Sequence, residues 1–87
     1  MTVSPSLPRA GVLAAVREAV AAVVPVSVAE LGEDTRLLDL EGMTSAKVIR
    51  VAAYLEESMG VTLISESAAP WHTVGDAVDA VSEAAGR

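Results

Sequence analysis

The 87-residue sequence contains no cysteine, and this absence excludes several kinds of site at once. Disulfide bonds, thiolate nucleophiles and cysteine-ligated zinc all require that side chain. Phenylalanine is also absent, and there is only one tryptophan and one tyrosine, so a core must be built from Val, Leu, Ile, Met and Ala. Alanine-rich apolar surfaces favour closely packed helices. The composition therefore predicts one small helical domain held together by aliphatic packing.

Basic residues are scarce, since six Lys and Arg stand against twelve Asp and Glu, and the formal net charge is −6. Nucleic-acid binding depends mainly on cationic side chains, so this balance argues against a nucleic-acid partner. Arg17 and Glu18 interrupt the best apolar stretch, which is too short for a membrane span of about 20 residues. The first residues lack the layout of a secretory signal. We expect a cytoplasmic monomer without nucleic-acid or membrane partners.

The first part of the chain reads as a short lead followed by a helix. Residues 1–8 contain two prolines and are expected to form a flexible N-terminal lead, with residues 9–87 as a single domain. Valines and leucines then recur at helical spacing, which predicts a helix over residues 9–24. Pro25 is expected to end it, because proline cannot continue a helix.

Two further long helices and a short one are predicted after a connecting loop. Residues 45–59 carry one apolar face, and Gly60 stands where a left-handed cap would end that helix. Residues 65–69 are expected to form one short helical turn. Thr73 and Asp76 have the spacing of a capping box at the start of the last helix. The predicted fold is therefore all-α, a small four-helix bundle of three main helices and one short helix.

The loop over residues 25–43 is long for so small a domain, and its leucines are expected to pin it to the core. It also carries five acidic residues: Glu30, Glu33, Asp34, Asp39 and Glu41. Their spacing lacks the alternating oxygen ligands and central glycine of a calcium-binding loop. We interpret them as a solvated acidic surface and predict no metal site.

The stretch GMTSA, residues 42–46, places two hydroxyl groups between the acidic loop and the second predicted helix. Thr and Ser are both common residues at helix starts, where a hydroxyl oxygen accepts a hydrogen bond from a free backbone N–H. Considered alone, the pair is explained by helix capping. A hydroxyl at a helix start is also exposed and accessible to a modifying enzyme, so attachment of a group is the alternative.

Three landmarks occur in order along the chain: LGEDTRLLDLEGMTS, an amphipathic helix closed by EESMGVTL, and TVGDAVDAV. This order resembles the acyl and peptidyl carrier proteins, the phosphopantetheine-bearing four-helix family, over about residues 10–85. The resemblance implies a free-standing carrier that does no bond-making chemistry itself. It implies that the carrier holds an acyl or aminoacyl group as a thioester on a covalent 4′-phosphopantetheine arm.

In that family the arm is attached to a serine at the start of the second helix, most often within an Asp-Ser-Leu triplet. On this chain the resemblance assigns the attachment to Ser45, with Thr44 in place of Asp and Ala46 in place of Leu. Thr44 can still cap the helix, so the exchange removes only a negative charge beside the serine. Either one of the acidic residues Glu41, Asp39 and Glu33 supplies the charge instead, or the transferase is a less demanding one.

The resemblance also implies three kinds of partner: a phosphopantetheinyl transferase, an adenylating ligase or acyltransferase that loads the cargo, and a downstream condensing or acyl-transfer enzyme. The candidate recognition residues surround the serine and are Met43, Thr44, Ala46, Lys47 and Arg50. The altered triplet and the basic start of the helix favour polyketide or nonribosomal-peptide biosynthesis over fatty-acid synthesis. Among these pathways, an amino-acid cargo is favoured by analogy.

Other interpretations remain open at this point. The chain is alternatively a fatty-acid-type acyl carrier protein, or an unmodified helical adaptor that kept the fold and lost the attachment. No catalytic residue is predicted, because the single histidine, His72, has neither a cysteine nor a second histidine to act with. Its neighbour Trp71 is expected to pack at the edge of the core.

Overall fold

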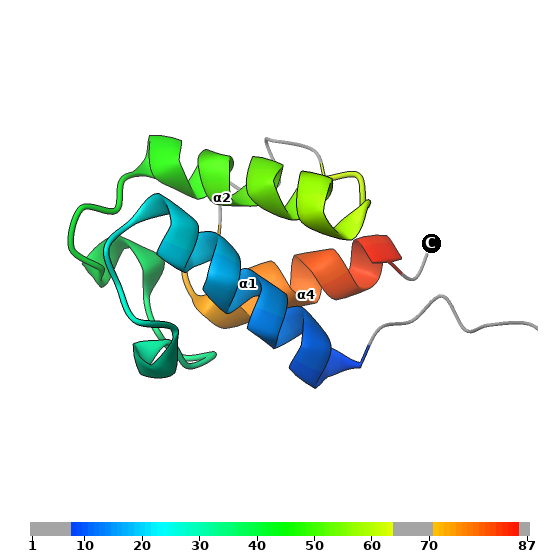
Figure 1. The fold of residues 1–87 in the computed structure, drawn as a ribbon, viewed down its shortest axis with the longest axis horizontal. Helices are drawn as coiled ribbons and strands as arrows, with labels where there is room; N and C mark the ends of the chain where they lie inside the picture. Colours follow the sequence, from blue (N-terminus) through cyan, green and yellow to red (C-terminus); the bar gives the residue numbers. More distant parts are fainter. Residues whose placement is uncertain (1–7, 64–70, 86–87) are drawn as a thin grey trace, which may run out of the picture.

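The computed structural model describes residues 8–63 and 71–85. Within these ranges the chain is all-helical, with three α-helices, α1 (Arg9–Val23), α2 (Ser45–Met59) and α4 (Val74–Ala85), and two 3-10 turns, η1 (Val28–Glu30) and η2 (Leu37–Asp39). Helix α1 packs against both α2 and α4 (Figure 1). The three predicted main helices are thus confirmed, whereas the short helix predicted over residues 65–69 and residues 1–7 of the predicted lead lie outside the described residues.

The first helix begins directly after Pro8 and ends at Val23, one residue before the predicted end and two residues before Pro25. The carbonyl of Pro8 accepts a hydrogen bond from Val12 N at 3.1 Å, which closes the first turn. At the other end Val24 is extended, with φ −130° and ψ 155°. A residue that precedes proline is driven out of the helical region by steric contact with the proline ring. Pro25 therefore ends α1 at Val23 through its effect on Val24.

The predicted caps of the other two helices are also present. Gly60 follows α2 in the left-handed region, with φ 65° and ψ 28°. At the start of α4, Asp76 N donates to Thr73 Oγ1 at 3.1 Å, and Thr73 N donates to Asp76 Oδ2 at 3.1 Å. A second amide, His72 N, donates to the same carboxylate oxygen at 2.7 Å. These amides, His72 N foremost, hold the pKa of Asp76 below its usual value.

Aliphatic side chains from all three helices form one core. The predicted faces are buried in each case, and the fully buried helical residues include Val12, Val16, Ala19 and Val20 of α1, Val51 and Leu55 of α2, and Val74, Ala77, Val78 and Val81 of α4. Trp71 is 5% exposed and belongs to the same core, as predicted. The small side chains of valine and alanine let the helices approach closely, which is consistent with a core that lacks phenylalanine.

The long loop between α1 and α2 is held to the core by two of its leucines. Leu31 and Leu37 are buried, and Arg17 Nε donates to the carbonyl of Leu31 at 2.6 Å. The expectation that the leucines generally pin the loop is wrong for Leu38, which is 55% exposed. In the 3-10 turn η2, neighbouring side chains point about 120° apart, so Leu37 takes the inward position and Leu38 cannot share it.

Backbone hydrogen bonds join the second half of the loop to the start of α4. They run from Leu37 N to His72 O (2.9 Å), from Val74 N to Thr35 O (3.0 Å) and from Gly75 N to Glu33 O (2.9 Å). A methyl group added to Gly75 would lie 3.1 Å from Glu33 O, so alanine would fit here only if this carbonyl moved by a few tenths of an ångström. These three bonds fix the middle of the loop against the start of α4.

Candidate functional site

Ser45 is the first residue of α2, and Thr44 is its N-cap. Thr44 has extended backbone angles, and its Oγ1 accepts a hydrogen bond from Lys47 N at 3.2 Å. The carbonyl of Thr44 accepts the first helical bond, from Val48 N at 3.0 Å. Thr44 therefore has the capping role that the sequence predicts for it. The two hydroxyls of the pair differ, because that of Thr44 accepts a backbone hydrogen bond and that of Ser45 has no hydrogen-bond partner within the described residues.

A tight turn brings the chain to this helix start. Met43 N donates to Leu40 O at 3.0 Å, and Gly42 lies within the turn at φ 82°. Residues other than glycine rarely adopt this left-handed conformation, so Gly42 is needed for the turn itself. Lys47 reaches back from the first turn of α2, and its Nζ donates to Gly42 O at 2.9 Å. Lys47 therefore holds the approach to Ser45 at two points, through its backbone amide and through its ammonium group.

The helix start fits a covalently bound phosphate group. In the described part of the chain, the backbone N–H groups of Ser45 and Ala46 have no hydrogen-bond acceptor. Such free amides, together with the positive end of the helix dipole, favour an anion at the N-terminus of a helix. Ser45 is itself exposed, so its hydroxyl is accessible to a modifying enzyme. A phosphodiester on Ser45 would therefore find favourable electrostatics and no steric obstacle.

Other serines of the described chain lack this combination. Ser27 caps η1, where its hydroxyl oxygen accepts a hydrogen bond from Ala29 N at 3.3 Å. Ser58 lies in the last turn of α2, where the free amides of a helix start are not available. The buried hydroxyl of Ser82 is shielded from solvent. Among the described serines, Ser45 alone joins an exposed hydroxyl to the start of an α-helix.

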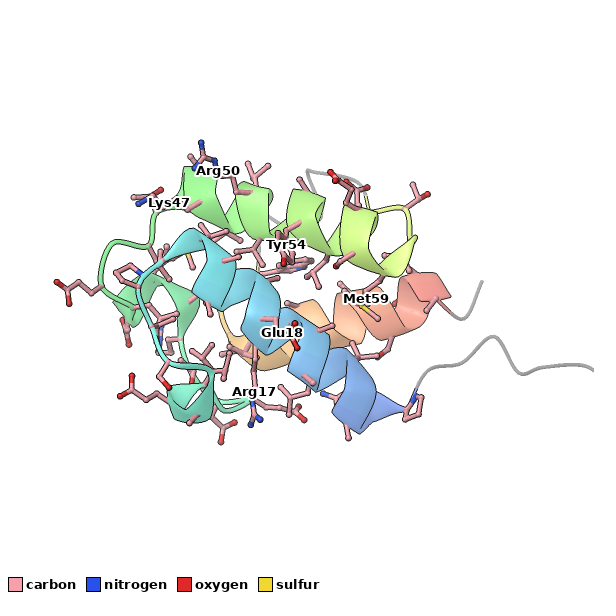
Figure 2. All side chains as sticks on the ribbon, in the orientation of Figure 1. Arg17, Glu18, Lys47, Arg50, Tyr54 and Met59 are labelled. Atoms are coloured by element: carbon pink, nitrogen blue, oxygen red, sulfur yellow. The ribbon has the colours of Figure 1, made fainter. Side chains whose placement is uncertain are left out.

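The structure separates the residues that the sequence nominates for partner recognition. Thr44, Ala46 and Arg50 are exposed, and Lys47 is half-buried. Met43 is only 7% exposed and packs in the hydrophobic core, so its side chain offers little surface to a partner. Met43 instead anchors the turn before Ser45 from the inside. The basic side chains Lys47 and Arg50 project from the first two turns of α2 (Figure 2).

The acidic residues of the loop differ in their availability to an enzyme at Ser45. Glu33 accepts hydrogen bonds from Arg9, which lower the pKa of this carboxyl group. Asp39 faces Arg36, with the nearest nitrogen and oxygen 3.9 Å apart. Glu41 is exposed, immediately precedes Gly42, and has no partner within the described residues. Among the acidic residues of the loop, Glu41 is therefore the best placed to replace the charge of the Asp that usually precedes the serine in this family.

Two exposed apolar residues were not considered as partner contacts in the sequence. Leu38, in η2, is 55% exposed, and Ile49, one turn into α2, is 42% exposed. The sequence predicts that Leu38 is one of the leucines that pin the loop, and Ile49 lies one position after the core residue Val48. The exposure of Ile49 could have been predicted, because its position lies outside the apolar stripe of the helix, on the side where Arg50 also lies.

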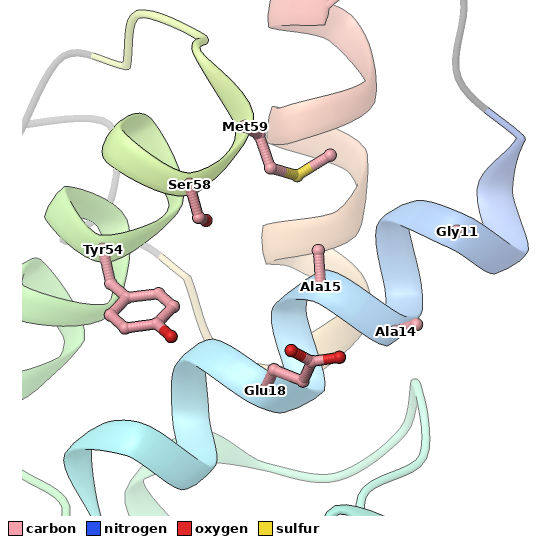
Figure 3. A pocket seen from close by; sticks show the side chains of 7 residues that line it. All are labelled: Gly11, Ala14, Ala15, Glu18, Tyr54, Ser58 and Met59. Atoms are coloured by element: carbon pink, nitrogen blue, oxygen red, sulfur yellow. The ribbon is translucent and has the colours of Figure 1, made fainter.

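A hollow of about 260 Å³ lies between α1 and α2, away from this site (Figure 3). Small residues of α1, among them Ala14 and Ala15, form one side, and Tyr54 and Met59 of α2 form the other. Tyr54 follows Ser45 by nine residues, which places the two about half a turn apart around the helix. The hollow is also smaller than typical ligand pockets, which begin at roughly 300 Å³. It is therefore separate from the helix start.

The described residues contain neither a candidate metal site nor a candidate membrane span. Within the described ranges, no three His, Cys, Asp or Glu residues are grouped so that they can bind a metal ion. No described helix has the length and apolar character that a membrane crossing requires.

Comparison with known proteins identifies the family. The family model described as a phosphopantetheine attachment site matches residues 14–81, which include α2 and most of α1 and α4. No curated protein and no solved structure matches the chain significantly. Domains of the matched family carry covalent 4′-phosphopantetheine and work with phosphopantetheinyl transferases and other partner enzymes. The chain therefore belongs to the family of phosphopantetheine-bearing carrier domains.

Proposed function

We propose that Ser45 is the attachment residue and that the chain is a carrier for an acyl or aminoacyl intermediate in specialised-metabolite biosynthesis. The observation that carries this proposal is the exposed hydroxyl of Ser45 at the start of α2, within the residues that match the family. The bound arm would supply the thiol that the sequence lacks, on which cargo is carried as a thioester. Tethering presents that cargo to successive enzymes at high effective concentration.

The residues around Ser45 would prepare and hold the attachment. Thr44 ends the extended segment and begins the helix, so that the Ser45 hydroxyl faces solvent rather than the backbone. The amides of Ser45 and Ala46 would stabilise the negative charge of the phosphodiester. Lys47 keeps the preceding turn in place through Gly42 O, and its positive charge lies at the same helix start. The chain itself would do no bond-making chemistry.

The departures from the common triplet support a specialised pathway. Thr44 removes a carboxylate next to the serine, and Ala46 offers less apolar surface than leucine. Partners that accept such a site are expected to be adapted to it: a transferase, a loading ligase or acyltransferase, and a condensing or acyl-transfer enzyme. By analogy, the basic start of α2 favours a polyketide or nonribosomal-peptide pathway with an amino-acid cargo.

Intact-mass measurement tests the attachment site. Co-expression with a broad-specificity phosphopantetheinyl transferase is expected to add the mass of one 4′-phosphopantetheine group. Ser45→Ala should abolish the addition, while Ser58→Ala, which alters another serine of α2, should retain it. A wild-type chain that gains no mass would indicate the unmodified adaptor instead. A gain that persists in Ser45→Ala would place the arm on another residue.

A loading assay tests the cargo. The modified carrier is incubated with adenylating ligases, amino acids and ATP, or with acyltransferases and acyl-coenzyme A donors, and the thioester is detected by mass spectrometry. Loading of an amino acid is the expected result. Efficient loading of acyl groups alone would overturn the amino-acid assignment and leave the carrier assignment intact.

A further inference from the structure

Glu18 of α1 is an exposed carboxylate with no hydrogen-bond or ion-pair partner within the described residues. It borders the hollow of about 260 Å³ between α1 and α2, together with Tyr54 and Ser58 of α2. Figure 3 shows the carboxylate of Glu18 and the phenol of Tyr54 directed toward one another across this hollow. None of the described residues that border it is basic, and the neighbouring Arg17 is bound to Leu31 O. The hollow therefore has a negative charge that nothing in the described chain neutralises.

The chemistry of this hollow fits an organic cation. An apolar chain or an anion laid over Glu18 would remove water from the carboxylate without replacing its hydrogen bonds, which is unfavourable. A divalent metal ion needs several oxygen ligands, and the described ranges contain no group of acidic side chains suited to a metal. A cation, by contrast, pairs with the carboxylate and also lies favourably on the face of an aromatic ring, here that of Tyr54.

Among the cations that proteins carry, the guanidinium group of arginine matches the hollow better than the ammonium group of lysine. Its planar shape stacks on an aromatic ring, and its five N–H donors serve several acceptors at once. The hollow offers such acceptors in the carboxylate of Glu18 and the hydroxyls of Tyr54 and Ser58. The aliphatic stem of an arginine would pack against Ala15 and Met59. Arginine therefore uses both the polar and the apolar parts of the lining.

A second hollow beside the first indicates that this arginine belongs to a protein. The second hollow has a volume of about 170 Å³ and shares Ala14 and Glu18 with the first. Val28 and Ala29 of η1 and Arg17 of α1 also border it, and Val28 is 42% exposed. A small guanidinium compound would leave this apolar surface uncovered, whereas a protein has apolar side chains beside its arginine and covers both hollows. The net charge of −6 also attracts a basic protein surface.

We propose that these two hollows on α1 form a docking site for a partner protein, which inserts an arginine side chain between Glu18 and Tyr54 and lays an apolar side chain against Val28. The proposal does not depend on the assignment of Ser45. Tyr54 lies about half a turn around α2 from Ser45, so this partner approaches from the side of α1 and leaves the start of α2 uncovered. The chain can therefore be held by this partner while another enzyme acts at Ser45.

The test titrates the isotope-labelled full chain with small capped probes and follows its backbone amide signals by NMR. The probes are acetyl-arginine amide, acetyl-lysine amide, the uncharged acetyl-citrulline amide and the tripeptide acetyl-Leu-Arg-Leu-amide. We expect the arginine probe to bind with millimolar affinity and to shift the signals of Ala15, Tyr54 and Met59 most. The lysine probe should bind more weakly, and the citrulline probe should cause no comparable shifts. The tripeptide should bind about threefold or more tightly than the arginine probe, because a leucine also covers the second hollow.

Three variants locate the contact. Glu18→Gln should weaken the binding of the arginine probe about threefold, because it removes the ion pair. Tyr54→Leu should weaken it about twofold to fivefold, because it removes the ring and keeps an apolar side chain. Glu57→Gln is the matched control: it removes an exposed carboxylate of α2 that borders neither hollow, and it should leave binding unchanged. Glutamine forms helices about as well as glutamate, so Glu18→Gln should unfold at the wild-type temperature.

Several results would overturn the docking site. Equal binding by Glu18→Gln and the wild type, or shifts centred on the acidic loop, would show that the probes respond only to the net charge. Equal binding of the citrulline probe would show that the hollow does not select a cation, and equal binding of the lysine probe would remove the preference for arginine. A tripeptide that binds no more tightly than the arginine probe would refute the partner protein and leave a free guanidinium compound as the occupant. None of these results bears on the arm at Ser45, which intact mass measures separately.

Discussion

Replacing Thr44 by alanine tests whether the two hydroxyls of the GMTSA stretch have separate roles. The substitution removes the Oγ1 that accepts the hydrogen bond from Lys47 N at 3.2 Å. Loss of a threonine N-cap costs about 1 kcal/mol of folding free energy. In a domain of this size, 1 kcal/mol corresponds to a fall in Tm of about 4–8 °C. The Ser45 hydroxyl is untouched, so attachment of the arm should continue.

Replacing Thr44 by aspartate, the residue usual in the family, extends the same reasoning. A carboxylate also caps the helix and adds about 0.3–1 kcal/mol through the helix dipole, so the Tm of the unmodified protein should rise by a few degrees. After modification, the phosphodiester on Ser45 would repel that carboxylate by about 1 kcal/mol if they lie 4 Å apart in water. The stabilisation seen before modification should therefore largely disappear after it.

Thermal unfolding followed by circular dichroism, before and after modification, measures these differences. Thr62→Ala provides the matched control, because Thr62 is exposed and its hydroxyl has no partner within the described residues. An unchanged Tm in Thr44→Ala would refute the capping role. If Thr44→Ala lost the arm while Ser45→Ala kept it, the roles assigned to the two hydroxyls would be reversed. An equal gain from Thr44→Asp before and after modification would show that the phosphate lies elsewhere.

Three further predictions concern the supports of the site and of the loop. Lys47→Met should free the carbonyl of Gly42 and lower the modification rate severalfold, with Lys47→Arg retaining most of it, as measured by the intact-mass time course. Gly75→Ala should destabilise the fold by about 1–3 kcal/mol in urea unfolding, because its methyl group would press on Glu33 O at 3.1 Å. The lowered pKa of Asp76 adds stability that is present above the unfolded value near 3.9 and is lost as the pH falls through the lower folded value. Asp76→Asn should therefore reduce Tm at pH 7 and weaken its dependence on pH below about 4.

The helices could be predicted closely because their signals are local. Pro25, Gly60 and the Thr73–Asp76 pair each act on the backbone within a few residues, and α2 has the bounds that its apolar spacing predicts. The buried face of each helix follows from the same spacing, since a residue's position around a helix is determined by its number along the chain. Helix ends and core faces thus require no information from distant parts of the sequence.

The loop was harder to predict, because its contacts are with distant residues. Nothing near Glu33 or Thr35 in the sequence indicates that their carbonyls accept hydrogen bonds from Gly75 N and Val74 N at the start of α4. The same difficulty explains Leu38, since the choice between two adjacent leucines depends on which way the 3-10 turn faces the core. For Met43 the sequence favours a core or edge position and keeps a partner contact as the minority alternative, and its 7% exposure agrees with the core position.

The division between Lys47 and Arg50 shows how one glycine changes the role of a charge. The two residues are three apart on one side of α2, and sequence alone assigns them to the same basic surface. The positive φ of Gly42 belongs to a turn whose carbonyl accepts a hydrogen bond from Lys47 Nζ at 2.9 Å. Arg50, one turn further along, has no such carbonyl within the described chain. The cation nearer to the serine is therefore used by the fold, and the more distant one stays exposed.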